Sequence, residues 1–166
     1  SYAELGKTMK DSELLSDAIE TAARIVSDHF KASALIDIAE SYAEIGDKEK
    51  ASSLLPDAIK TAERISYDSA KAIVLRSTVR PIARIKDKEK ARLLLSDLIK
   101  AAERINKDAD KSYVLSVITE SYAELGKTMK DSELLSDAIE TAARIVSDHF
   151  KASALIDIAE SYAEIG

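Results

Sequence analysis

The chain has 166 residues, of which 46% are hydrophobic and 33% are charged, so it is long enough to bury a core and charged enough to stay soluble. A formal net charge of -6 argues against a nucleic-acid partner, because phosphate binding needs a concentrated cationic surface. The absence of cysteine excludes disulfides and is typical of a cytoplasmic protein. No apolar run reaches the ~20 residues that a membrane span needs.

The sequence repeats with a period of 40 residues and without a gap. We therefore predict one repeat domain of residues 1–166, with blocks 1–40, 41–80, 81–120 and 121–160 and a partial block 161–166. Several columns are the same in every block, among them Leu14, Leu54, Leu94 and Leu134, and Ala22, Ala62, Ala102 and Ala142. Residues 121–166 also duplicate residues 1–46 at every position. This pattern indicates a three-block module that was duplicated or joined deliberately by engineering.

Two apolar stripes with helical spacing alternate along the chain. One stripe consists of Ala32, Leu35, Ile38, Ala39, Tyr42 and Ile45, and we name this helix and its counterparts the A helices. The next stripe consists of Leu54, Leu55, Ala58, Ile59, Ala62 and Ile65, which predicts a helix of about 18 residues, the B helix. Each block is therefore predicted to form a helical hairpin.

Short polar residues and glycines mark the predicted helix ends. One aspartate precedes each A helix, where its side chain can accept from the free N–H groups of the first turn; these predicted N-caps are Asp28, Asp68, Asp108 and Asp148. A glycine after an A helix can end it in the left-handed conformation, and we expect this of Gly6, Gly46 and Gly126. Asp47 is predicted to start a B helix, and Thr8 to Asp11 resembles a capping box.

Two prolines, Pro56 and Pro81, fall inside predicted helices in place of serines found in other blocks. Proline inside a helix removes a hydrogen bond and typically costs ~3 kcal/mol. We expect local bends at both positions. The alternative, a domain boundary at Pro81, is opposed by the 40-residue phase, which continues across it.

The spacing of these residues resembles the tetratricopeptide repeat. The resemblance is carried by Leu35, Ile38–Ala39, Tyr42, Gly46, Ala51, Leu55 and Ala58, and again by Leu115, Ile118–Thr119, Tyr122, Gly126, Leu135 and Ala138. The departures are a period of 40 residues where the family norm is about 34, no proline at the end of the second helix, and Lys86 where a glycine is expected. The resemblance implies an all-α fold, a right-handed α-solenoid of antiparallel helical hairpins.

The resemblance also implies a protein-interaction function, in which the A helices line a concave groove that holds a peptide or a helix. Carried over to this sequence, the groove-facing positions are Ser33, Ile36, Asp37, Glu40 and Glu44 in one A helix and Ile73, Arg76, Ser77, Arg80 and Arg84 in the next.

Arg76, Arg80 and Arg84 share one helix face because they are spaced i, i+4 and i+8. Such a ridge could clamp the carboxylates of a ligand. Alternatively, Arg80 and Arg84 form an interhelical ion-pair ladder, because the matching positions of the neighbouring blocks are glutamates: Glu40, Glu44, Glu120 and Glu124. Arg76 has no glutamate at its level and is the better candidate for binding.

Catalytic chemistry has little support in the sequence. His29 and His149 each follow a predicted capping aspartate, and no second histidine or cysteine in the same block completes a metal or nucleophile site. No glycine-rich phosphate loop is present. We expect a non-catalytic protein without a cofactor.

The alternative to a binding module is a structural building block that stacks end to end. A terminal repeat without a polar outer face tends to associate, and a head-to-tail contact that does not close produces filaments. We expect the A helix over 150–165 of one molecule to dock beside the B helix over 10–27 of the next. The residues predicted to carry this contact are Leu14, Leu15, Ile19, Leu155, Ile158 and Tyr162.

Overall fold

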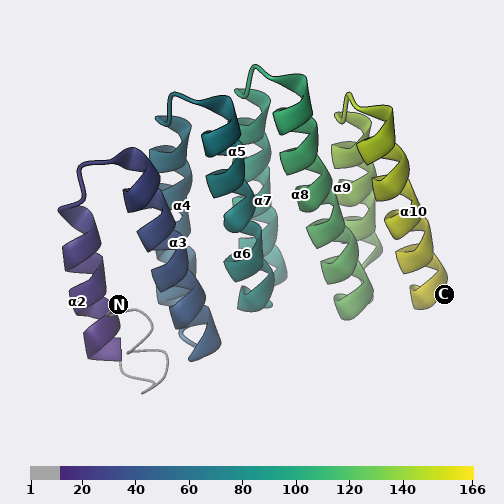
Figure 1. Cartoon of the computed structure of the whole chain (residues 1–166). Helices are drawn as coiled ribbons and strands as arrows, with labels where there is room; N and C mark the ends of the chain where they lie inside the picture. Colours follow the sequence, from purple (N-terminus) through teal and green to yellow (C-terminus); the bar gives the residue numbers. More distant parts are fainter. Residues whose placement is uncertain (1–11) are drawn as a thin grey trace.

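The computed structural model of the chain describes residues 12–166, and this part is all-α, without strands. The helices are α2 (Ser12–Ala23), α3 (Asp28–Glu44), α4 (Lys48–Glu63), α5 (Asp68–Ser77), α6 (Val79–Ile85), α7 (Lys88–Glu103), α8 (Asp108–Met129), α9 (Ser132–Ala143) and α10 (Asp148–Ile165). In Figure 1 the helical hairpins follow one another from α2 at one end of the molecule to α10 at the other. In this part of the chain, no helix is both long and apolar enough to cross a membrane.

The helices form two layers. In Figure 1, α4, α7 and α9 lie behind α3, α5, α6, α8 and α10. Each helix of the front layer packs against helices next to it in sequence and also against its neighbours in the same layer: α3 contacts α2, α4, α5 and α6, and α8 contacts α5, α6, α7, α9 and α10. The contacts of α3, α8 and α10 thus connect hairpins that are about 40 residues apart in sequence.

The core lies between the layers and is filled by residues from the same columns of the sequence. Four leucines are fully buried: Leu15, Leu55, Leu95 and Leu135. Four alanines are buried beside them, Ala22, Ala62, Ala102 and Ala142, where a small side chain allows close packing of helices. The 40-residue period therefore holds for these two core columns, whereas the column of Leu14 is less uniform: Leu14 and Leu54 are half-buried, and Leu94 and Leu134 are buried.

The predicted caps of the A helices are wrong by one residue. Asp28, Asp68, Asp108 and Asp148 are the first residues of α3, α5, α8 and α10, and the N-cap residues before them make no side-chain capping bond. A carboxylate in the first turn still complements the helix dipole. Two of these aspartates bind the next hairpin instead: Asp28 accepts from the Arg64 guanidinium at 2.8 Å, and Asp68 accepts from the backbone N–H groups of Asn106 and Lys107 at 3.0 Å each.

The B helices do have aspartate caps. The side chain of Asp47 accepts from the backbone N–H of Lys50, as the prediction that Asp47 starts α4 requires. Asp87 and Asp131 cap α7 and α9 in the same way. The predicted capping box of Thr8 to Asp11 lies outside the described residues, as does Gly6.

The glycines predicted to end A helices behave differently from each other. Gly46 ends α3 with a φ of 89°, as predicted, and Lys86 takes the same left-handed region with a φ of 50° after α6. Gly126 was expected to end its helix, but it lies inside α8, which continues to Met129 and ends at Lys130 with a φ of 53°. A Cβ on Gly126 would lie 2.7 Å from Cδ2 of Leu135 in α9, so glycine is needed here for close packing.

The two prolines also have different effects. α4 continues through Pro56 without interruption. The helix predicted over Pro81 is interrupted at Thr78, which separates α5 from α6, because proline has no N–H to donate to the carbonyl of Ser77. Thr78 keeps right-handed helical angles, and its buried hydroxyl donates to the carbonyl of Leu75 at 2.5 Å. α6 packs against α3, α4, α7 and α8, so the helix packing continues across Pro81.

Candidate binding groove and end face

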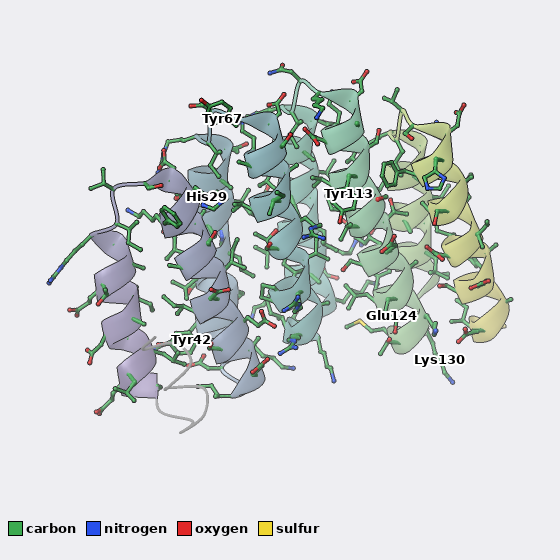
Figure 2. The ribbon with its side chains drawn as sticks, viewed as in Figure 1. His29, Tyr42, Tyr67, Tyr113, Glu124 and Lys130 are labelled. Carbon is green, nitrogen blue, oxygen red and sulfur yellow. The ribbon has the colours of Figure 1, made fainter. Side chains whose placement is uncertain are left out.

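A groove of about 1050 Å³ lies along the front layer between α3, α5, α6 and α8. The residues lining it are Ile36, Asp37, Glu40, Arg76, Ser77, Val79, Arg80, Ala83, Lys86, Tyr113, Val117, Glu120, Ser121, Glu124, Leu125, Thr128 and Met129. Figure 2 shows Tyr113 near one end of α8 and Glu124 near the other, so the groove follows the length of this helix. Its lower part is lengthened by the extension of α8 past Gly126, which adds Thr128 and Met129.

The groove includes most of the positions that the sequence assigned to it. Ile36, Asp37, Glu40, Arg76, Ser77 and Arg80 line it. Four residues that were expected in the groove do not line it: Ser33, Glu44, Ile73 and Arg84. Of these, Ile73 is exposed on α5. The wall formed by α8 was not identified as part of the groove from the sequence.

Arg76 has a partner that the sequence comparison missed. Its guanidinium donates to the hydroxyl of Tyr113 at 2.6 Å and lies 5.3 Å from the centre of that ring. The Tyr113 ring also lies near Phe150 of α10, with 5.7 Å between the centroids of the Tyr113 and Phe150 rings. Tyr113 holds Arg76 at the groove wall. It lies about one turn away from Ser116, which with Ile36 occupies the level of Arg76 in the 40-residue pattern.

Arg80 and Arg84 form an ion-pair ladder on one side only. Arg80 lies 3.4 Å from Glu40, and Arg84 lies 3.4 Å from Glu40 and also pairs with Glu44. Within residues 12–166, neither arginine pairs with Glu120 or Glu124 of α8. Exposed pairs of this kind contribute only ~0–1 kcal/mol each, so the ladder fixes the orientation of the arginines more than it stabilises the fold.

The side of the groove on α8 is acidic and faces the cations of α5 and α6. Burial, together with the nearby carboxylate of Asp157, raises the pKa of Glu120. Glu124 lies 3.7 Å from Lys127. Between these charged walls the groove has apolar side chains from both helices, including Val79 and Leu125. The Ser121 hydroxyl beside them is buried and has no hydrogen-bond partner among the described residues.

A second hollow of about 310 Å³ lies between α8 and α10 and is lined mainly by carboxylates. Its lining residues are Glu120, Ala123, Glu124, Lys127, Asp157, Glu160, Ser161 and Glu164. Lys127 bridges the two helices at 3.2 Å from Glu164, and hydrogen bonding to this carboxylate raises the pKa of Lys127. No group of acidic or histidine side chains in the described part of the chain is arranged to hold a metal ion.

The exposed face of α10 is the second candidate surface. α3 and α10 share one sequence from Asp28/Asp148 to Ile45/Ile165. Within α3 the side chains of Leu35, Ile36 and Tyr42 are 6%, 2% and 0% exposed, because α4, α5 and α6 pack against that helix. The same residues of α10, Leu155, Ile156 and Tyr162, are 46%, 59% and 37% exposed. An apolar surface that is covered in one copy of the sequence is therefore open in the other.

The other residues predicted for self-association differ in exposure. Leu15 and Ile158 are buried in the core and are not accessible to a second molecule. Leu14 and Ile19 of α2 are half-buried. Exposed apolar side chains that were not predicted include Ile156 in α10, Val26 in the turn before α3 and Phe30 in the first turn of α3. Ile156 could have been found, because it lies in the same column as Ile36, an apolar residue that was assigned to the groove-facing side of the A helix.

The histidines lie at helix starts, as predicted. His29 and His149 are the second residues of α3 and α10, and each lies with its ring near the following phenylalanine, at 5.2 Å and 5.6 Å between centroids. Figure 2 labels His29 near the start of α3.

No protein-family model, no curated protein and no solved structure matches the chain.

Proposed function

We propose that the chain is a non-catalytic helical-repeat scaffold, a right-handed α-solenoid of tetratricopeptide-like hairpins that serves as a structural building block and associates end to end. The exact recurrence of residues 1–46 at 121–166 supports a module that was duplicated or engineered by joining. Nearest-neighbour stacking permits such extension, because each hairpin needs only the surfaces of the hairpins beside it.

The observation that carries this proposal is the open face of α10. Full burial of a large apolar side chain contributes ~1.5–3 kcal/mol. Leu155, Ile156 and Tyr162 are each about half exposed, so covering all three contributes on the order of 3 kcal/mol. Association also costs translational and rotational freedom. We therefore expect a weak contact that forms at high protein concentration.

Light scattering over a concentration series tests the proposal. The mass of the wild-type chain is expected to rise with concentration, and Ile156→Lys is expected to prevent the rise. The matched control is Leu93→Lys, since Leu93 is also an exposed apolar residue but lies in the middle of the chain, on α7. A wild-type chain that stays monomeric at every concentration and salt condition would refute the proposal.

The groove favours a second function, a protein-interaction module that binds a peptide or a helix. Arg76 and Arg80 provide cations above an apolar floor, which fits a helical peptide with acidic side chains along one edge. Fluorescence anisotropy with labelled acidic helical peptides is the test. Arg76→Glu should weaken binding, whereas Arg24→Glu, which changes an exposed arginine at the end of α2, should not. Equal affinities of both variants would exclude this site.

A further inference from the structure

The structure contains a template for the contact between two copies. α9 and α10 have the same sequence as α2 and α3, and within the chain they pack against α8. The last part of the described chain, residues 161–166, reads SYAEIG, and residues 121–126 of α8 read SYAELG. A second copy can therefore place its α2 and α3 against α10 in the manner in which α9 and α10 lie against α8.

This template brings carboxylates together. On one side of the contact between α8 and α10 lie Glu120 and Glu124, and on the other lie Asp157, Glu160 and Glu164. Lys127 is the cation that joins the two sides within the described part of the chain. Carboxylates on facing helices repel each other and oppose the contact. Burial raises the pKa of Glu120, and the carboxylate of Asp157 across the contact raises it further.

In a stack, the same type of contact forms between copies. The acidic residues of α10 would lie level with Asp37, Glu40 and Glu44 of the second copy, because these residues occupy the same columns of the 40-residue pattern. Arg80 and Arg84 of the second copy lie on the far side of its α3, where they neutralise only part of this charge.

The other neighbour of α3 shows what a complementary surface looks like. There Glu40 and Glu44 meet Arg80 and Arg84 of α6. Glu160 and Glu164 of α10 are the equivalents of Glu40 and Glu44. In a stack they would face the carboxylates of α3 in the second copy and not arginines. Within one chain the acidic contact of α8 with α10 is tolerated because the linker between α8 and α9 holds the helices together. Two separate copies lack that linker.

We propose that end-to-end association joins α10 of one copy to α2 and α3 of the next, and that the carboxylates facing each other across this contact hold it back until salt screens them. This inference rests on the proposed end-to-end function. It predicts that wild-type chains stack more tightly as ionic strength rises, because exposed charges are screened beyond a Debye length of about 8 Å at physiological salt.

A double variant tests the charge arrangement directly. Glu160→Arg with Glu164→Arg gives α10 the cations that α6 presents to Glu40 and Glu44. Both positions are exposed, and although the ion pair of Lys127 with Glu164 is lost, the new arginines lie in the same hollow as Glu120 and Glu124 of α8, so folding should persist. Light scattering at low salt is expected to show association strengthened by about tenfold relative to wild type. Added salt should then weaken the contact in the double variant, the opposite of its effect on wild type.

The control is Asp57→Arg with Asp97→Arg, which makes the same change in net charge at exposed positions of α4 and α7. A double variant that associates no better than this control, while wild type stacks at high salt, overturns the charge arrangement and leaves end-to-end stacking intact. If neither wild type at high salt nor the double variant associates, the proposed function fails as well. Circular dichroism confirms that each variant is folded.

Discussion

Gly46 and Gly126 occupy the same column of the sequence, but the structure needs glycine at each for a different reason. Gly46 has a φ of 89° and open space around it, with no atom within 4 Å of an added Cβ. Gly126 lies inside α8, where an added Cβ would meet Cδ2 and Cγ of Leu135 at 2.7 Å and 2.8 Å. Alanine is therefore expected to cost stability at both positions through separate mechanisms.

The size of each effect follows from these environments. At Gly126, overpacking a core contact costs ~1–3 kcal/mol and alanine regains up to ~1 kcal/mol of helix propensity, so the expected net loss is about 1–2 kcal/mol. At Gly46, a left-handed alanine costs ~1–2 kcal/mol, part of which is regained because alanine has less freedom than glycine in the unfolded chain, leaving a loss of about 1 kcal/mol.

A double-mutant cycle separates the two mechanisms. Leu135→Ala removes the atoms that clash with an alanine at 126, so it should cost about 1–2 kcal/mol less in the Gly126→Ala background than in wild type. The matched cycle pairs Gly46→Ala with Leu55→Ala, which removes the equivalent fully buried leucine and should be additive within ~0.5 kcal/mol. Urea unfolding followed by circular dichroism gives the free energies. A stabilising Gly126→Ala, or equal coupling in both cycles, would refute the packing argument.

Three further predictions concern single residues. Lys86→Gly should stabilise the chain by about 0.5–1 kcal/mol in urea unfolding, because Lys86 is held in the left-handed region that glycine adopts without strain. Asp68→Ala should cost about 1 kcal/mol, since its carboxylate accepts two backbone N–H groups of the next hairpin; Asp148→Ala, which loses no such bond within residues 12–166, should be nearly neutral. Burial raises the pKa of Tyr122 to about 12 from an ordinary value of 10.0. The tyrosine therefore ionises first in the unfolded chain, and the free energy of unfolding should fall as pH rises from 10 through 12. Tyr122→Phe should remove this part of the fall, and an unchanged pH profile of stability would contradict the argument.

The sequence predicted the helices and the core because both depend on spacing. Apolar residues with helical periodicity within a block, repeated every 40 residues, identify which face of each helix is buried. The helix ends were less predictable. An aspartate at a helix start can cap its own helix or bind the next hairpin, and only the packing decides between these, as Asp47 and Asp68 show. Gly126 illustrates the same limit, because its role depends on the position of Leu135.

The groove was predicted in part for a similar reason. Residues of α3, α5 and α6 were assigned to it by their column, and the ladder of Arg80 and Arg84 was foreseen as one of two alternatives. The contact of Arg76 with Tyr113 was not foreseen, because the sequence comparison considered only residues at the same level of the 40-residue pattern. A long arginine side chain reaches a residue about one turn away, so column matching misses such pairs.

Because α3 and α10 have the same sequence, comparing them measures how much a neighbouring hairpin contributes to the local stability of a helix. Every amide of residues 28–45 has a chemical twin at 148–165, so intrinsic exchange rates cancel when the two are compared. Any difference in hydrogen-exchange protection then reports the coupling free energy of α3 to α4, α5 and α6 relative to that of α10 to α8. This comparison needs no substitution, because one chain supplies both the covered and the uncovered state of the same helix.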